Sequence, residues 1–126
     1  PEKTYDTDAG FDIRTPYTVV VQPHDSIVVD TGVCMLIPKG YVGMLKSKSG
    51  LNVNHGLRGE GVIDSGFSAS IVAKLYNDSD KPHIFNAGDK LIQIVLLPIP
   101  DVELHLVKEF TVETERGENG FGSTGV

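Results

Sequence analysis

The sequence of 126 residues predicts an all-β domain, and three observations support this fold class. Short runs rich in β-branched and aromatic residues recur along the chain, separated by turn-forming segments such as Pro38-Lys39-Gly40. No segment shows a helical period longer than the one short turn that could follow Gly50. The length suits a single hydrophobic core. We therefore expect a β-sandwich or β-barrel.

The expected strands are runs of β-forming residues bounded by Gly, Pro, Asn or Asp. In chain order they are Tyr17–Gln22, Ser26–Asp30, Val33–Ile37, Val42–Lys46, Ser70–Tyr76, His83–Phe85, Lys90–Leu97 and Val102–Val107. The stretch Ile92–Leu97 is almost uniformly apolar. This predicts a strand that is buried on both faces, either in the core or at a subunit contact.

Composition and charge exclude several classes of function. The formal net charge of −6 argues against a nucleic-acid polymer as ligand, because such a ligand requires a basic surface. No apolar run approaches the roughly 20 residues of a membrane-spanning helix. Cys34 is the only cysteine, which excludes an intrachain disulfide and favours a reducing, cytoplasmic location. Its apolar neighbours predict that Cys34 is a small buried hydrophobe.

Two segments that interrupt the strand pattern carry candidate phosphate or metal chemistry. Asp8–Ile13 places two carboxylates around a Gly, where they could hold Mg²⁺ directly or through its waters, although an ordinary exposed turn has the same pattern. Ser47–Leu51 places Lys48 between two hydroxyls, as in a phosphate cradle. A solvated loop is an equally good interpretation of this second segment.

Two further interruptions contain a carboxylate and an amide that suit a site. Gly59–Phe67 has the pattern of a hairpin in which Asp64 follows two apolar residues, so we expect Asp64 to be partly enclosed, as suits a general base. Phe67 could pack on a sugar, or it could be an ordinary core aromatic. Gln93 interrupts an apolar run, so its amide is expected either to bond to the backbone or to point into a site.

The C-terminal stretch Arg116–Gly125 combines a permanent cation, one aromatic ring, several glycines and two hydroxyls. Glycine amides, Ser123 and Arg116 could together clamp an anion. Phe121 offers a flat face for a planar ring such as a base. The stretch is therefore expected to be a flexible flap over a nucleotide, although most Gly-rich termini are simple tails.

Taken in order and at this spacing, five segments resemble the five motifs of the trimeric dUTP pyrophosphatases (dUTPases). They are Asp8–Ile13, Ser47–Leu51, Gly61–Phe67, Gly88–Gln93 and Arg116–Gly125. The resemblance implies a distorted jelly-roll or β-clip fold in a homotrimer. Residues 1–114 would form the β-domain, and residues 115–126 an arm that closes over a neighbouring subunit's site. It also implies Mg²⁺-dependent hydrolysis of dUTP to dUMP and pyrophosphate, which keeps uracil out of DNA and supplies dUMP for thymidylate synthesis.

The resemblance further implies a role for each matching residue. Asp64 would hold the attacking water, Phe67 would exclude a ribose 2′-hydroxyl, and Asp12 would help to place hydrated Mg²⁺. The other expected substrate-binding residues are Gly61, Val62 and Ile63 for uracil, Lys48, Ser49, Gly50 and Gln93 for the phosphates, Phe121 for stacking on uracil, and Arg116, Gly122 and Ser123 for the closing clamp on the outer phosphates.

The chain departs from the family pattern at a few positions. Lys48 stands where the family usually has Arg, which keeps the charge but loses the planar fork. Phe67 stands where Tyr is usual, and Ser68–Ser70 replaces a basic residue, Gly and Glu. A deaminase of dCTP shares the expected fold but would need a catalytic Glu where Lys74 lies. A non-catalytic trimer that regulates a protein partner is the second alternative.

Overall fold

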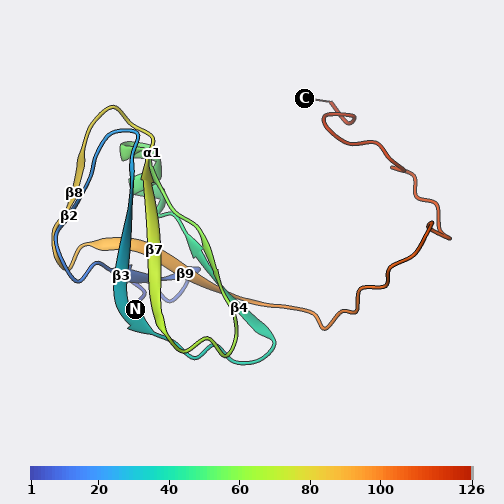
Figure 1. Ribbon diagram of the computed structural model, residues 1–126, viewed down its shortest axis with the longest axis horizontal. Helices are drawn as coiled ribbons and strands as arrows, with labels where there is room; N and C mark the ends of the chain where they lie inside the picture. The colour runs from blue at the N-terminus through green and yellow to red at the C-terminus, as the bar shows by residue number, and fades with distance from the viewer. Residues whose placement is uncertain (126) are drawn as a thin grey trace.

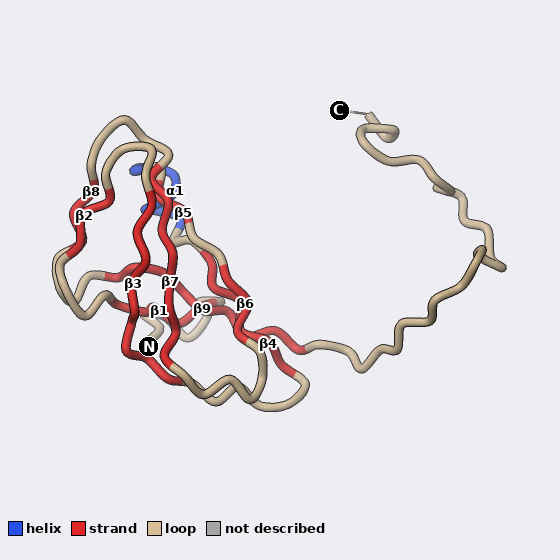
Figure 2. The backbone as a smooth tube through the Cα atoms, in the orientation of Figure 1, coloured by secondary structure: helices blue, strands red, loops and turns tan. Residues whose placement is uncertain are grey.

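The computed structural model describes residues 1–125, whereas Val126, the last residue of the predicted arm, lies outside the described residues. The described part contains nine strands and one short helix (Figures 1 and 2). The elements are β1 (Gly10–Arg14), β2 (Val19–Val21), β3 (Ser26–Cys34), β4 (Tyr41–Lys46), α1 (Ser49–His55), β5 (Leu57–Arg58), β6 (Gly61–Ile63), β7 (Ser70–Asn77), β8 (His83–Phe85) and β9 (Lys90–Pro98). The all-β class is thus confirmed.

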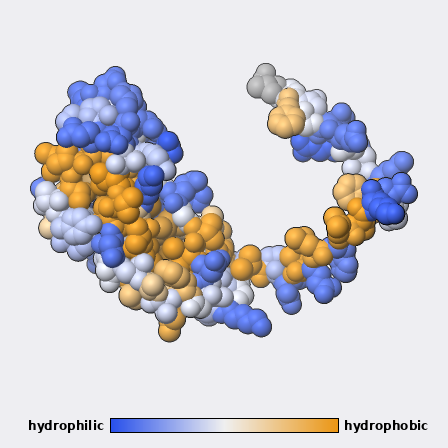
Figure 3. Space-filling view, in the orientation of Figure 1, coloured by the Kyte–Doolittle hydropathy of each residue, from blue (hydrophilic) through white to orange (hydrophobic). Residues whose placement is uncertain are grey.

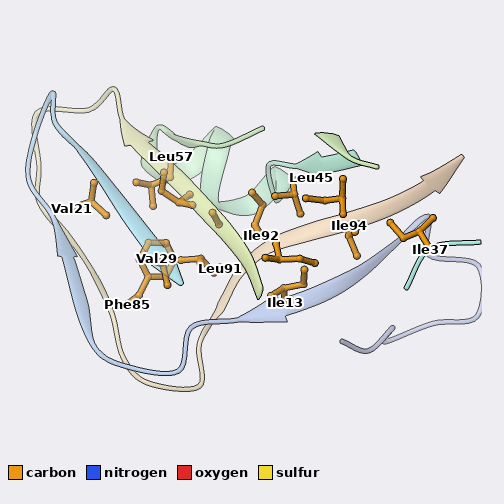
Figure 4. Close-up of a cluster of buried hydrophobic side chains, with 14 residues drawn as sticks. Ile13, Val21, Val29, Ile37, Leu45, Leu57, Phe85, Leu91, Ile92 and Ile94 are labelled. Carbon is orange, nitrogen blue, oxygen red and sulfur yellow. The ribbon is translucent and has the colours of Figure 1, made fainter. Parts of the chain in front are cut away.

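The strands form three antiparallel sheets. One has the order β1-β9-β4-β6, a second has the order β3-β7-β5, and β2 pairs with β8. Alternate residues of β7, which has eight residues, are buried, as expected for a strand with one face on the core. The inward side chains of the sheets meet in one apolar cluster that includes Ile13, Val29, Leu45 and Ile94 (Figure 4).

The prediction of separate strands at Ser26–Asp30 and Val33–Ile37 is wrong, because one bulged strand replaces them. β3 continues to Cys34, and its register on β7 shifts between Asp30 and Cys34. Gly32 adopts a φ of 69° at this bulge, a conformation that glycine allows without steric cost, and its amide donates to Asp30 Oδ1 at 3.1 Å. Cys34 itself is exposed, so its predicted burial is also wrong.

The predicted strand Val102–Val107 is also wrong. From residue 99 to residue 125 the chain has no helix or strand, and it runs away from the body as an extended segment (Figure 1). Leu104 and Leu106 are almost completely exposed, at 96% and 102%. The alternating pattern is real, but among residues 1–125 no strand lies beside it to accept its hydrogen bonds.

The apolar stretch Ile92–Leu97 is buried only in its first half. Ile92 and Ile94 are fully buried, whereas Leu96 and Leu97 are 37% and 46% exposed. The exposed half lies where β9 approaches the point at which the chain leaves the body, near the hydrogen bond from the Ile99 amide to the Gly40 carbonyl. Burial on both faces is therefore not found within a single chain.

Sequence patterns did not predict β1, β5 or β6 as strands. β5 and β6 are two and three residues long, and each is held by pairing with a longer neighbour. The short helix expected after Gly50 is present as α1, which begins at Ser49 and ends at His55, and Gly56 caps it with a φ of 69°. In residues 1–125 there is no helix long and apolar enough to cross a membrane.

We expect the stability of the folded chain to depend on pH through the imidazole of His83 on β8. Burial lowers the pKa of His83, the neighbouring His55 lowers it further, and Asp89 opposes the change in part. Below about pH 6.5 the unfolded chain therefore binds more protons at this position than the folded chain, so stability falls as the pH falls. Thermal melts at pH 7 and pH 5 should show the difference in melting temperature, and this difference should be smaller in His83→Gln.

The matched control for this prediction is His105→Gln, because His105 lies on the exposed C-terminal segment. Its melting temperature should depend on pH as the wild type's does. An undiminished pH dependence in His83→Gln would contradict the role given to His83.

Candidate active site

A surface hollow of about 340 Å³ gathers residues from the first, second and fourth of the sequence segments described above. It lies where β1 and β9 run side by side next to the chain that joins β4 to α1. Its lining residues are Thr4, Tyr5, Asp8, Ala9, Gly10, Asp12, Lys48, Ser49, Gly50, Lys90 and Gln93. The hollow therefore brings together Asp12 and the phosphate residues predicted in the second and fourth segments, although they are far apart in the sequence, whereas the phosphate residues predicted on the arm lie outside it.

Asp12 is the buried charge of this hollow, and only 9% of its side chain is exposed. One carboxylate oxygen accepts a hydrogen bond from Lys48 Nζ, and the other lies 3.2 Å from Lys90 Nζ. Burial raises the pKa of Asp12, but the hydrogen bonds and charges of the two lysines outweigh it and hold this pKa below its ordinary value. Asp12 is consequently ionised at neutral pH, and the hollow presents a carboxylate between two cations.

Gln93 lies on β9, which runs between β1 and β4, and two neighbours fix its side-chain amide. Its Nε2 donates to the Ser47 carbonyl at 3.0 Å. Its Oε1 lies against Gly10, where a Cβ would come within 2.4 Å of that oxygen. The sequence left open whether this amide bonds to the backbone or faces a site, and in the structure it does both.

The donor set of the hollow suits a hydrated divalent cation bound mainly by phosphate. Residues 1–125 contain no group of three or more His, Cys, Asp or Glu side chains that could hold a metal by themselves. Asp12 and Asp8 offer carboxylate oxygens, which Mg²⁺ prefers, but Lys48 and Lys90 already contact both oxygens of Asp12. These residues therefore fit an Mg²⁺ that keeps its waters and is carried by a polyphosphate.

Asp64 and Phe67 lie elsewhere on the chain, in the turn that follows β6. The structure leaves Asp64 exposed, so the expected enclosure is not found within one chain. Ile63 pairs with Gly43, near the start of β4, whereas Lys48 follows the end of β4. At about 3.4 Å per residue this puts Asp64 roughly 20 Å from Lys48. Figure 2 shows α1 and the turn between β6 and β7 at opposite ends of the body.

The uracil-reading segment predicted at Gly61, Val62 and Ile63 forms β6, which pairs with β4 at the sheet edge. Val62 is 61% exposed and Ile63 is buried. Phe67 is 42% exposed, so it is not an ordinary core aromatic in this chain. This edge leaves backbone groups of β6 open to a planar ligand.

The C-terminal residues fold into local turns away from the body. Arg116 Nε donates to the Asn119 carbonyl at 2.7 Å, and Arg116 and Ser123 line the same hollow. Phe121 is fully exposed and Gly122 has a φ of 86°. The arm thus brings its cation and hydroxyl together without contacting the hollow around Asp12.

Two residues of the site were missed by the sequence analysis. Lys90 lies within the fourth segment, but nothing in the local sequence indicates a role for it. Only the pairing of β1 with β9 places it beside Asp12. Ser47 contacts both Gln93 and Gly59, which the sequence could not show because these partners are distant along the chain. In each case the missing information is strand register.

Comparisons with known proteins identify the family of the chain. The dUTPase family model matches residues 1–125. The deoxyuridine 5′-triphosphate nucleotidohydrolase of Cutibacterium acnes is 38% identical over 123 residues, which is 94% of this chain and 80% of that protein.

Two solved phage structures share the fold. A mutant dUTPase of Staphylococcus bacteriophage 80alpha, solved with dUpNHpp, superimposes with a TM-score of 0.92 at 34% identity, covering 100% of this chain and 91% of the other. A mutant dUTPase of phage phi11 of S. aureus, described with a structural Mg(II) ion, has a TM-score of 0.81 at 32% identity and covers 89% and 91%.

The dCTP deaminase alternative finds no support at the position that it requires. Lys74 lies on the outward face of β7, where it approaches the ring of Tyr76 at 5.2 Å. A cation on an exposed strand face cannot replace a catalytic Glu. With the family model matching the described chain and the fold superimposing closely, the chain belongs to the dUTPase family of dUTP-hydrolysing enzymes.

Proposed function

We propose that this protein hydrolyses dUTP to dUMP and pyrophosphate, with Mg²⁺ on the phosphates, at sites shared between the subunits of a homotrimer. The observation that carries the proposal is the hollow in which Asp12, Lys48, Lys90 and Gln93 converge. Two cations, an amide and a buried carboxylate suit a polyphosphate that carries a hydrated metal ion. Family membership supplies the nucleotide and the reaction.

The separation between the hollow and Asp64 supports a site built from more than one chain. A base that lies roughly 20 Å from Lys48 cannot activate a water against a phosphate held by that same lysine. A second copy that places its Asp64 turn over this hollow would complete the site. The exposure of Asp64 and Phe67 in the single chain then has a simple explanation, because the partner would cover them.

The segment after β9 also supports association of several copies. Val102, Leu104 and Leu106 alternate as strand residues do, and all three are exposed. Figure 3 shows apolar side chains along the part of the segment nearest the body. Such a segment is unfavourable in water, whereas an edge strand of a neighbouring copy would bury it and satisfy its backbone. The arm at residues 115–126 would then reach a neighbour's site.

The proposed chemistry uses side chains of this chain in three roles. Asp64 accepts a proton from a water as that water attacks the α-phosphorus, and the bond from this phosphorus to the bridging oxygen breaks, so that pyrophosphate leaves. Lys48 and Lys90 exchange part of their contact with Asp12 for phosphate oxygens. Gln93, Ser49 and Gly50 bind further oxygens. Bound Mg²⁺ would supply positive charge that stabilises the departing pyrophosphate, with Asp12 oriented toward its waters.

The remaining predicted residues would select the nucleotide and close the site. Phe67 would pack on the deoxyribose and leave no room for a 2′-hydroxyl. The backbone of β6 would bond to uracil, and Phe121 would stack on the base. Arg116 and Ser123 would bind the outer phosphates, and Gly122 would let the backbone approach them.

The direct test measures pyrophosphate release, with Mg²⁺ present, from dUTP, dCTP, dTTP and UTP in parallel. We expect release from dUTP alone, because uracil and deoxyribose are both selected. Ammonia from dCTP would assign the protein to the deaminases instead. Absence of turnover on all four nucleotides would favour a trimer that only binds nucleotide or regulates a protein partner.

Mixing two inactive variants tests whether the site is shared. Asp64→Asn and Lys48→Ala should each be inactive alone, and subunits exchanged between them should form some sites that have both native residues. Activity should therefore return after mild unfolding and joint refolding. The control is each variant refolded alone. If the mixture stays inactive while both variants refold as oligomers, Asp64 and Lys48 act from the same chain.

A further inference from the structure

Ser47 joins two parts of the molecule through different atoms. Its hydroxyl donates to the Gly59 carbonyl at 3.2 Å and accepts from the Gly59 amide at 3.0 Å. Its own carbonyl accepts from Gln93 Nε2 at 3.0 Å. Ser47, which is half-buried, thus links Gly59, just before β6, to the Gln93 amide in the hollow around Asp12.

The register of β4 on β6 explains why the hydroxyl makes these bonds. Gly43 pairs with Ile63 and Leu45 pairs with Gly61, so the next equivalent position in the ladder places Ser47 opposite Gly59. In an antiparallel ladder, every second opposite pair exchanges two backbone hydrogen bonds, and the pairs between them exchange none. Here Ser47 Oγ makes both bonds to Gly59. The Ser47 carbonyl makes no bond to Gly59 and accepts from Gln93 Nε2 instead.

We infer that Ser47 is a positioning residue for phosphate binding, because its hydroxyl ties it to Gly59 just beyond the β4–β6 ladder while its carbonyl holds Gln93. A hydroxyl is required, since the side chain of Ala has neither a donor for the Gly59 carbonyl nor an acceptor for the Gly59 amide. The inference rests on the proposed function, because it assigns Gln93 to the phosphates of the substrate.

Close packing around Gly59 fixes the position of the residue to which the Ser47 hydroxyl bonds. A Cβ at residue 59 would come within 2.8 Å of the Lys74 carbonyl and 3.0 Å of Ile92 Cδ1, so the backbone at this position has little freedom to move. Gly59 is therefore a fixed point against which Ser47 is held. Loss of the hydroxyl should free the chain just before Lys48 and release the carbonyl from Gln93.

Inhibition by inorganic pyrophosphate and by dUMP, measured on the full-length enzyme, separates the phosphate hollow from the rest of the site. We expect Ser47→Ala to weaken pyrophosphate inhibition about three- to tenfold, the range for one net hydrogen bond, and to leave dUMP inhibition within about twofold. Ser47→Thr keeps the hydroxyl and should retain most of the wild-type inhibition by pyrophosphate. Gln93→Ala should weaken pyrophosphate inhibition similarly, and the double variant should add nothing to it.

The matched control is Thr18→Ala, which removes a hydroxyl that accepts from the Ala87 amide at 3.2 Å in the turn after β8. It should lower the melting temperature by no more than Ser47→Ala does, because it loses one exposed bond instead of two part-buried ones, and it should leave pyrophosphate inhibition unchanged. Normal inhibition in Ser47→Ala, or effects of Ser47→Ala and Gln93→Ala that add, would overturn the inference. Normal inhibition in Gln93→Ala would instead overturn the assignment of the hollow to phosphate, and the inference with it.

Discussion

Replacing Asp64 with Asn should reduce dUTP turnover by on the order of 10³-fold, because the amide cannot accept the proton of the attacking water. Binding of dUTP should remain nearly intact, since Asn keeps the size of the side chain and the phosphate residues lie in the hollow around Asp12. Steady-state kinetics give the loss of kcat, and calorimetry with the inactive variant gives the dissociation constant.

Asp80→Asn is the matched control for this substitution. Asp80 is an exposed carboxylate that pairs with His24 at 2.7 Å, away from the residues of the candidate site. Its loss should leave kcat within about twofold, as is usual for surface positions. Full activity in Asp64→Asn would remove Asp64 from the chemistry, and weakened dUTP binding of similar size would make it a binding residue instead.

Removal of residues 116–126 should lower kcat/KM by on the order of 10²-fold and leave the oligomer unchanged. The deletion removes Arg116 and Ser123, which line one hollow on the arm and would stabilise charge on the outer phosphates. It keeps the exposed apolar residues Val102, Leu104 and Leu106, which are expected to hold neighbouring copies together. Pyrophosphate release and light scattering measure the two properties separately.

Arg116→Ala and Phe121→Ala divide this effect between the phosphates and the base. Arg116→Ala should account for most of the loss, because a permanent bidentate charge is removed. Phe121→Ala should cost less, since only one stacking surface is lost. Turnover at the wild-type rate in the truncated protein would show that the arm does not close the site, and loss of the oligomer would show that it has a structural role.

Local patterns predicted the long strands well, because the alternation in β7 and the apolar run in β9 depend on neighbours along the chain. They failed where the outcome depends on distant partners. The stretch Val102–Val107 has a strand pattern but no partner strand in the described part of the chain, whereas the three residues of β6 become a strand because β4 lies beside them. The bulge at Gly32 similarly joined two expected strands into one.

The candidate site divides in the same way. The residue types and their order along the chain were enough to identify Asp12, Lys48, Gln93 and Asp64 as candidates, because a carboxylate, a cation or an amide in a Gly-rich interruption has a recognisable chemistry. Spatial relations came from strand pairing alone. The pairing of β1 with β9 brings Lys90 to Asp12, and the pairing of β4 with β6 separates Asp64 from Lys48. Register between distant strands depends on packing of the whole core, which no local window of sequence contains.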